Sequence, residues 1–486
     1  MLIIGITVLA LNLRAAITSL PPVFPELSAR LGLSATAITV LAAVPVLCFG
    51  LFSGVAAPLS RRFGEERVLL ASLGLVAAGL ALRGALPGSL LYPGTVLACG
   101  AIALMNVLLP SMIKRRQPAR AGLLIGIYLL SLAVGSVFGS LLAVPAFRDT
   151  AHAAWLGGPV RFSLWLWAVP AAVAFVVWLP QWRYGPSGGA SAGPLAAPSA
   201  GPSVASASAV LGNPGASAAL GNPGASAVPG NPGASVVPGN PGASVVPGSN
   251  LGASVVSGDL GASVVPGASA VPGVAVVPGV AAVPRGTAGR LSGRVSVSRH
   301  ALAWQVTAFM GLQSMTYYAA LSWLPTLLRD RGSSAAHAGD LLALMNLGNA
   351  ITCLLIPVLA HRMPAQRVLV VPTALGTAVG IAGALYAPLG GAWAWILLLG
   401  LAQGSSLGMA IFFTMARAPD PVAAASLSAL AQGWGYLLAT LGPLAVGLLY
   451  ASTGGWNVPI GMLLVLCAGQ LAVGWLAARG RVLPAA

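Results

Sequence analysis

Charge is scarce in this sequence. Only 7% of its 486 residues are charged, and 8 acidic residues stand against 24 basic ones. A soluble domain usually carries about 25% charged residues, so this chain cannot cover a globule with a hydrated surface. Together with a hydrophobic content of 57%, the shortage of charge predicts a protein whose solvent is mostly lipid.

Residue types that serve catalysis or metal binding are also few. The four cysteines stand singly inside apolar runs, the four histidines lie at the ends of such runs or between them, and no CxxC or Cys/His metal spacing occurs. The sequence also has no phosphate-binding loop of the P-loop type and no Ser/His/Asp constellation. We therefore expect no enzyme activity, no cofactor, no metal and no transport driven by ATP.

The net charge of +16 raises the question of nucleic-acid binding. The basic residues form no single block, however. They fall in short clusters between apolar runs, which is how orientation in a membrane is encoded. We expect the partners to be the lipid bilayer and a small-molecule substrate, with no nucleic acid among them.

About twelve apolar runs have the roughly 20 residues that a bilayer crossing requires. Backbone groups in lipid must be paired within the segment, so these runs are predicted to be helices. The first run lacks the basic start and the cleavage site of a signal peptide, and we interpret it as the first span. The runs lie near residues 2–21, 36–58, 67–86, 91–113, 121–145, 161–180, 300–325, 337–360, 367–387, 391–416, 422–450 and 457–479.

A segment of different composition, about 185–297, separates the sixth run from the seventh. It repeats a nine-residue unit rich in Pro, Gly, Ala, Ser and Val. Frequent Pro and Gly exclude a helix or a regular sheet, so we predict a disordered cytoplasmic linker, with partner binding through the repeat as the alternative. The predicted fold is an all-α membrane protein with twelve transmembrane helices in two six-helix bundles, 1–184 and 298–486.

The basic residues also predict an orientation. If the linker is cytoplasmic, the loops on its side hold most of the Lys and Arg residues, including Arg61, Lys114 and Arg115, whereas the opposite side holds few, among them Arg83. Cytoplasmic loops are the ones enriched in Lys and Arg. Both termini are therefore expected on the cytoplasmic side of the cytoplasmic membrane.

The two halves repeat each other in places. Residues 15–21 resemble 319–325, and residues 60–69 resemble 360–369. Each match falls at the corresponding place, either after the first span of a half or between its second and third spans. A duplicated helical unit with a site between the copies at mid-membrane is typical of secondary transporters.

Arg14 is the residue on which the functional hypothesis depends. It lies inside the first apolar run, where a charge costs about 2.5–3.5 kcal/mol on insertion scales and indicates a functional site. None of the eight acidic residues falls deep in a predicted span to neutralise it. We expect Arg14 to face a central cavity and bind an anion or a strongly dipolar solute through its planar guanidinium. The alternative is that it binds backbone carbonyls at a broken helix, or Glu26 at the rim.

Further polar residues recur at helical spacing on the later spans. Gln313 and Tyr317 are four residues apart and so share a helix face, as do Gln432 and Tyr436. One interpretation is hydrogen bonding between helices, at about 0.6 kcal/mol for each bond. The other is a small-molecule pocket built from amides and phenols around one arginine. On that interpretation the substrate-binding residues are Arg14, Asn12, Thr18, Asn106, Tyr128, Gln313, Tyr317, Asn346, Gln432 and Tyr436.

A series of short motifs runs through both halves in order. In the first half these are Asn12-Leu13-Arg14 with Thr18-Ser19 and Pro21, Asn106 and Pro110 followed by Lys114, and Gly126-Ile127-Tyr128. In the second half they are Gln313-Ser314, Tyr317-Tyr318, Trp323-Leu324-Pro325, Gln432-Gly433-Trp434-Gly435-Tyr436, Gly442-Pro443 and Gly454-Gly455-Trp456. The series resembles that of the major facilitator superfamily, and within it the cyanate permease and nitroimidazole transporter family.

The resemblance implies a secondary transporter that moves a small anionic or polar solute, cyanate- or nitroimidazole-like, by alternating access. An exporter of hydrophobic compounds with the same fold is the alternative within transport, and a membrane-embedded enzyme or receptor is the alternative outside it. We expect a monomer.

One loop departs from the superfamily pattern. Between the second and third spans, relatives usually carry an acid followed by basic residues. Here Arg61 stands at the position of the acid, and Glu65 and Glu66 stand at those of the bases. A charge-based gate at this loop would need a different arrangement of partners.

Overall fold

The structure is a computed structural model that describes residues 2–117, 120–148, 154, 157–180, 297–363 and 365–484. All regular structure within these ranges is helical. The predicted linker at 185–297 lies outside them, apart from Val297. The first half contains α1 (Leu2–Thr18), η1 (Pro21–Val23), α2 (Phe24–Leu31), α3 (Ala35–Phe63), α4 (Glu65–Ala85), α5 (Leu91–Arg116), α6 (Ala121–Arg148), α8 (Pro159–Trp165) and α9 (Ala168–Trp178). The second contains η5 (Val297–Arg299), α11 (Ala301–Asp330), α12 (Ala335–Arg362), α13 (Arg367–Tyr386), η6 (Leu389–Gly391), α14 (Ala392–Ala416), α15 (Pro421–Ala439), α16 (Leu441–Thr453) and α17 (Asn457–Ala477).

Eleven helical stretches of the described chain are long and apolar enough to cross a membrane, and each coincides with a predicted span. The remaining predicted span, 300–325, is the 30-residue helix α11, which is less apolar because it carries polar residues such as Gln313 and Thr316. The first helix ends at Thr18 rather than near residue 21, because the consecutive prolines Pro21 and Pro22 lack the N–H donors that would continue it.

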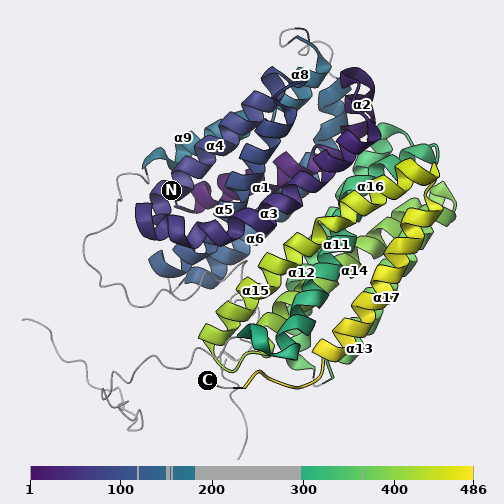
Figure 1. The fold of residues 1–486 in the computed structure, drawn as a ribbon. Coiled ribbons are helices and arrows are strands. Elements are labelled where there is room, and N and C mark those ends of the chain that lie inside the picture. Colours follow the sequence, from purple (N-terminus) through teal and green to yellow (C-terminus); the bar gives the residue numbers. More distant parts are fainter. Residues whose placement is uncertain are drawn as a thin grey trace, which may run out of the picture. The chain divides into compact units, whose positions relative to one another are not determined.

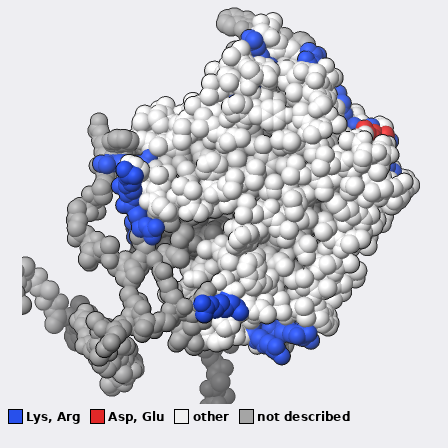
Figure 2. Space-filling view, in the orientation of Figure 1, with Lys and Arg blue, Asp and Glu red and all other residues white. Residues whose placement is uncertain are grey.

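The surface matches a lipid environment. Figure 2 shows a face that is almost free of charged side chains across its middle, with Lys and Arg gathered toward its edges. Large apolar side chains are exposed on several spans, among them Leu51, Phe138, Val176 and Val465. Such a surface is solvated by lipid tails in a bilayer, whereas in water it would drive association.

Helices pack mainly against others of their own half (Figure 1). In the first half α1 packs against α6 and α4 against α5, and in the second α12 packs against α14 and α11 against α15. Between the halves, α3 packs against α15 and α16, and α6 packs against α12. The second span of each half therefore lies beside the fifth span of the other. Two copies of one unit related by an approximate two-fold axis would give this exchange of partners.

The turns that precede the second spans also repeat. Gly32 (φ 62°) and Ser34 precede α3, and Gly332 (φ 97°) and Ser334 precede α12. The hydroxyl of each serine accepts a hydrogen bond from the amide three residues later, at 3.1 and 3.2 Å, and so caps its helix. The glycines supply the left-handed turn, which other residues adopt at a cost. The same local sequence thus builds the same turn twice, in agreement with the predicted duplication.

The two halves meet in polar and aromatic contacts at the end of the spans that carries these turns. Nη1 of Arg329 in α11 lies 2.7 Å from Oε2 of Glu26 in α2. The ring of Phe24 lies 6.4 Å from that of Trp323. Deeper in the spans, the amide of Asn346 donates to the hydroxyl of Ser140 at 3.2 Å. These contacts close the interface between the halves at this end.

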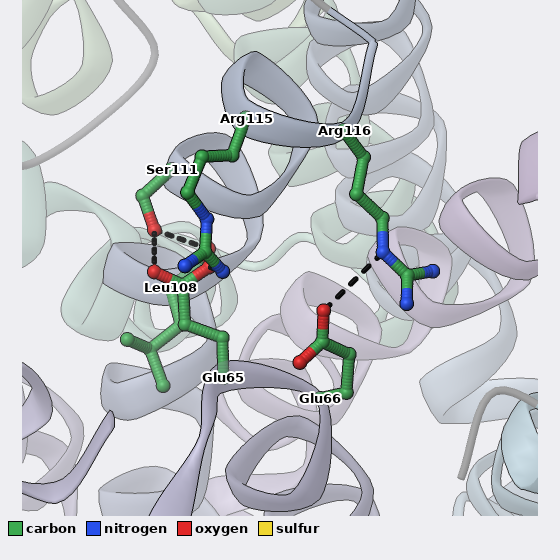
Figure 3. Close-up of polar contacts among 6 residues, drawn as sticks. All are labelled: Glu65, Glu66, Leu108, Ser111, Arg115 and Arg116. Atoms are coloured by element: carbon green, nitrogen blue, oxygen red, sulfur yellow. Dashed lines mark hydrogen bonds and ion pairs between the residues drawn. The ribbon is translucent and has the colours of Figure 1, made fainter. Parts of the chain in front are cut away.

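At the opposite end, the first half contains two ion pairs (Figure 3). Nη2 of Arg115 lies 2.5 Å from Oε2 of Glu65, and Nε of Arg116 lies 3.2 Å from Oε1 of Glu66. The hydroxyl of Ser111 donates to Glu65 at 3.3 Å. The acids stand in the first turn of α4 and the bases in the last turn of α5, where each charge complements its helix dipole. The unusual charge order of this loop is therefore balanced by partners on α5.

The Glu65–Arg115 pair is expected to contribute modestly to stability. Glu65 is buried but the Arg115 side chain is 55% exposed, so solvent screens the pair. We expect a double-mutant cycle of Glu65→Ala and Arg115→Ala to give a coupling free energy of about 1 kcal/mol or less, measured by thermal unfolding in detergent. Arg61→Ala, which removes an exposed arginine near the same turn, is the control and should not couple to Glu65. A coupling equal to that of Arg61 would show that the pair contributes nothing.

Candidate substrate-binding site

A cavity of about 150 Å³ lies between the halves. Side chains from α1, α3, α5 and α6 line one side, and side chains from α11, α12, α14 and α15 line the other. Its polar lining residues are Arg14, Ser53, Asn106, Tyr128, Ser136, Tyr317, Tyr318, Asn346, Asn349, Gln432 and Tyr436. Both halves thus contribute hydrogen-bonding groups to one central space.

Arg14 reaches this cavity from α1. Its Nη1 atom is buried without a hydrogen-bond partner, and the phenols of Tyr317 and Tyr318 interact with the guanidinium. No Asp or Glu is among the described residues that line the cavity. Glu26, considered above as a partner for Arg14, pairs with Arg329 instead, so that alternative is wrong. The positive charge of Arg14 therefore faces the cavity without a carboxylate beside it.

Two tyrosine–asparagine pairs lie in the cavity lining, one in each half. The hydroxyl of Tyr128 donates to Oδ1 of Asn106 at 3.0 Å, and the hydroxyl of Tyr317 donates to Oδ1 of Asn346 at 3.2 Å. Each bond fixes the phenol and the amide in one orientation. The phenolic oxygens keep lone pairs that can accept a hydrogen bond from a solute.

Aromatic rings form a further part of the lining, which we call the aromatic wall and define as Phe49, Tyr317, Tyr318 and Tyr436. The ring of Phe49 lies 5.8 Å from that of Tyr436 and 6.4 Å from that of Tyr318. The rings of Tyr317 and Tyr318 are 5.1 Å apart in an edge-on arrangement. Rings packed in this way support one another and offer flat apolar surface to a planar molecule.

Seven of the ten residues predicted from the sequence line the cavity: Arg14, Asn106, Tyr128, Tyr317, Asn346, Gln432 and Tyr436. Gln432 donates from Nε2 to the hydroxyl of Ser428 one turn earlier on α15, at 3.2 Å. That these seven residues bind a substrate stays a prediction.

The other three predicted residues lie outside the cavity lining. The amide of Asn12 donates to the carbonyl oxygens of Val8 and Pro170, at 2.8 and 3.1 Å. The Thr18 hydroxyl donates to the Ser136 carbonyl at 3.0 Å. Gln313 is 1% exposed, and its amide donates to Ser314 and to the Met310 sulfur. Asn12 and Thr18 thus connect α1 to α9 and α6, which is the interhelical hydrogen bonding that the sequence left open as an alternative.

The sequence prediction omitted several lining residues. Asn349 lies three residues after Asn346 on the same face of α12, so its spacing offered a signal. Tyr318 follows Tyr317 directly, and consecutive residues of a helix do not share a face, so spacing offered no signal for Tyr318. The Nδ2 atom of Asn349 is buried without a partner, as is Nη1 of Arg14. Phe49 and Cys353 gave no signal, because an aromatic ring or a thiol inside an apolar run looks like packing.

Comparison with known proteins identifies the fold and the family. A family model of the Major Facilitator Superfamily matches residues 4–443. The 2-nitroimidazole transporter of Escherichia coli (strain K12) is 30% identical over 459 residues, which cover 94% of this chain and 90% of that protein. The cyanate transport protein CynX of the same organism is 24% identical over 456 residues, which cover 94% of this chain and 91% of that one.

A solved structure agrees at the level of the fold. It is the crystal structure of a bacterial homologue of the human lysosomal transporter Spinster, in an inward-facing and unoccupied conformation. The match has a TM-score of 0.67 with 14% identity and covers 99% of this chain and 98% of that one. The family and these relatives are transporters, so the alternative of a membrane-embedded enzyme is wrong. The chain belongs to the major facilitator superfamily, within it to the family of the 2-nitroimidazole and cyanate transporters, and is a secondary transporter of small solutes.

Proposed function

We propose that this transporter carries a small planar anion, or a small and strongly dipolar heterocycle, and that Arg14 binds the negative end of the solute. The observation that supports this proposal is that the Arg14 side chain lines the cavity with one guanidinium nitrogen unpaired. The unpaired nitrogen is Nη1, and no carboxylate is among the described residues of the lining. A solute that brings negative charge supplies the partner that the described lining residues do not provide.

The energetic argument concerns desolvation. A charge held away from water without a partner is unfavourable by several kcal/mol, and an opposite charge with good geometry offsets much of this. Hydrogen bonds to a charged group are worth about 1.5–3 kcal/mol each, more than those between neutral groups. The planar guanidinium also matches planar oxyanions, to which it donates two parallel hydrogen bonds. Binding is therefore selective for anions, and Arg14 repels cations.

The remaining lining residues supply orientation and shape. We assign hydrogen bonding with the solute to Asn106, Tyr128, Tyr317, Asn346, Gln432 and Tyr436. The aromatic wall favours a flat molecule over a bulky one. Cyanate and 2-nitroimidazole, named for the relatives, are both small: the first is a linear anion, and the second is a planar heterocycle with a polar nitro group.

The cavity lies between two helical halves, and rocking of one half against the other would expose it to each side of the membrane in turn. We infer that the end closed by Glu26 and Arg329 faces outward and that both termini are cytoplasmic, because Lys and Arg are more numerous in the loops of the other end. Opening to the outside then requires this ion pair to break while the halves close at the cytoplasmic end. We also infer a monomer in the cytoplasmic membrane, because one chain provides both walls of the cavity.

The aromatic wall favours a second candidate, the export of apolar compounds. Uptake into liposomes that contain the purified protein distinguishes the two. We expect labelled cyanate or 2-nitroimidazole to be transported, planar monoanions such as benzoate to compete, and a hydrophobic dye cation to be neither transported nor competitive. Dye transport that is indifferent to anions would favour the second candidate. Absence of both transport and ligand-induced thermal stabilisation for every planar monoanion tested would contradict the anion site.

A further inference from the structure

A second arginine is buried in the first half without a carboxylate partner among the described residues. Arg83 of α4 is 1% exposed, and it does not line the cavity. The sequence placed it among the residues of the outer side, but the structure puts it inside the helical packing. Its Nη1 donates to the carbonyl oxygen of Ala16 at 3.3 Å, whereas Nε and Nη2 are buried without partners.

The carbonyl that Arg83 binds belongs to the last turn of α1. The final carbonyl groups of a helix lack intrahelical donors and carry the negative end of the helix dipole. Here the chain turns after Thr18 toward Pro21, and the hydroxyl of Ser19 also donates to Ala16, at 3.4 Å. The guanidinium of Arg83 therefore supplies both a hydrogen-bond donor and a positive charge to the end of α1.

Two other arginines contact helix ends in the same way. Arg331 donates to the carbonyl oxygens of Ala384 and Ala387 at the end of α13, the first at 2.5 Å. Nε of Arg417 donates to the carbonyl oxygen of Ala477, the last residue of α17, at 2.9 Å. Of these three arginines, Arg83 is the one that acts on the helix that carries Arg14.

The position of Arg83 depends on close packing of α4 against α5. A Cβ atom at Gly94 of α5 would lie 2.8 Å from the backbone nitrogen of Arg83, and a Cβ atom at Gly79 of α4 would lie 2.7 Å from the carbonyl oxygen of Gly94. Both distances are shorter than real contacts allow, so the two glycines permit this approach. This close packing against α5 fixes the position of the α4 backbone at Arg83.

We propose that Arg83 is a positioning residue for substrate binding: by holding the last turn of α1, it sets the direction in which the Arg14 side chain enters the cavity. Ala16 lies two residues after Arg14, and the Arg14 carbonyl itself accepts a hydrogen bond from Thr18 at 3.1 Å. Loosening this turn therefore moves Arg14. The effect on affinity rests on the function proposed for Arg14, whereas the effect on geometry does not.

The first test separates affinity from stability. Arg83→Met removes the charge and the donor, Arg83→Lys keeps the charge, and Arg417→Met is the matched control at a buried helix end away from the cavity. In liposomes we expect Arg83→Met to raise KM for cyanate, or for 2-nitroimidazole, about tenfold with little change in maximal rate. Arg83→Lys should recover most of this loss, and Arg417→Met should leave KM unchanged. In an Arg14→Lys background the effect of Arg83→Met should shrink, because substitutions that act on the same binding interaction are not additive.

The second test needs no ligand. Arg14→Cys is made together with Cys353→Ala, since Cys353 is a native thiol of the cavity lining. The rate at which a cationic thiosulfonate modifies residue 14 then reports where its side chain points. We expect Arg83→Met to change this rate by about threefold or more, and Arg417→Met to leave it unchanged.

The outcomes are distinct. If the wild-type protein neither binds nor transports the probes, the proposed function fails, while the thiol rate still decides the role of Arg83. If Arg83→Met lowers only the thermal stability, and both KM and the thiol rate stay at control values, Arg83 is merely structural and the inference is overturned.

Discussion

Replacing Arg14 by alanine is expected to abolish transport while the protein still inserts and folds. The substitution removes the cationic group of the cavity and with it about 3 kcal/mol of charge-assisted hydrogen bonding, which corresponds to a loss of about 100-fold in affinity. Thermal stability in detergent should stay equal or rise, because an unpaired buried charge destabilises the fold that holds it. Uptake of cyanate or 2-nitroimidazole into liposomes measures the first effect, and thermal unfolding measures the second.

Arg14→Lys is the matched variant. Lysine keeps the charge but not the planar fork, so partial activity is expected. Arg417→Met serves as a control, because it removes a buried cation away from the cavity and leaves the cavity lining intact. Transport at the wild-type rate by Arg14→Ala would eliminate the anion site. A large fall in thermal stability would show instead that Arg14 is a packing residue.

Gly135→Ala is expected to have the second large effect, on folding rather than on binding. Gly135 lies on α6 against α1, and a Cβ atom there would stand 2.2 Å from the carbonyl oxygen of Leu11. The Leu11 carbonyl oxygen belongs to the backbone and cannot rotate away as a side chain can. To accommodate the added Cβ atom, α1 must therefore move away from α6. We expect a destabilisation of about 1–3 kcal/mol or more, measured by thermal unfolding. Because Leu11 is one turn before Arg14, any folded fraction should also bind anions weakly.

The same helix provides the control. Gly126 of α6 has no atom within 4 Å of the position of an added Cβ. Alanine exceeds glycine in helix propensity by about 1 kcal/mol, so Gly126→Ala should be neutral or stabilising. The two substitutions are chemically identical and differ only in their neighbours. Equal effects at the two positions would mean that α1 and α6 are less closely packed than the structure has them.

A similar contact between two helices of the second half indicates how general this packing is. A Cβ atom at Gly404 of α14 would stand 2.0 Å from the carbonyl oxygen of Asn349 in α12. Asn349 lines the cavity, as Arg14 does. In both halves, a helix that carries a polar cavity residue thus packs backbone to backbone against a glycine of its neighbour, which is a common arrangement between membrane helices.

The sequence located the spans well because a single physical constraint dominates them. In lipid, length and apolarity determine which segments cross, and neighbouring segments matter little. The predicted and observed spans differ where a helix is not defined by contact with lipid alone. Helix α11 carries polar residues because much of its surface faces other helices, and α1 ends early because two prolines follow it.

The sequence also singled out Arg14, because a charge in an apolar run without a nearby acid is conspicuous in the chain itself. It could not separate Gln313, which binds Ser314 and Met310, from Tyr317 one turn later, which faces the cavity. Helical spacing tells which residues share a face. It does not tell which neighbouring helix that face meets, because crossing angles and rotations depend on every contact along the helix.

By itself, then, the sequence determined a membrane protein of repeated helical halves with an arginine inside its first span and no acid deep in any span, because hydropathy and charge act locally along the chain. Only the tertiary structure decided that Asn12 and Thr18 bond neighbouring helices while Tyr318 and Asn349 face the cavity. It also showed that Arg83, which the sequence placed among the residues of the outer side, is buried and donates to the carbonyl oxygen of Ala16 in the last turn of α1. The physical reason is that hydrogen-bond partners far apart in sequence are chosen by packing, and packing is set by the whole bundle at once.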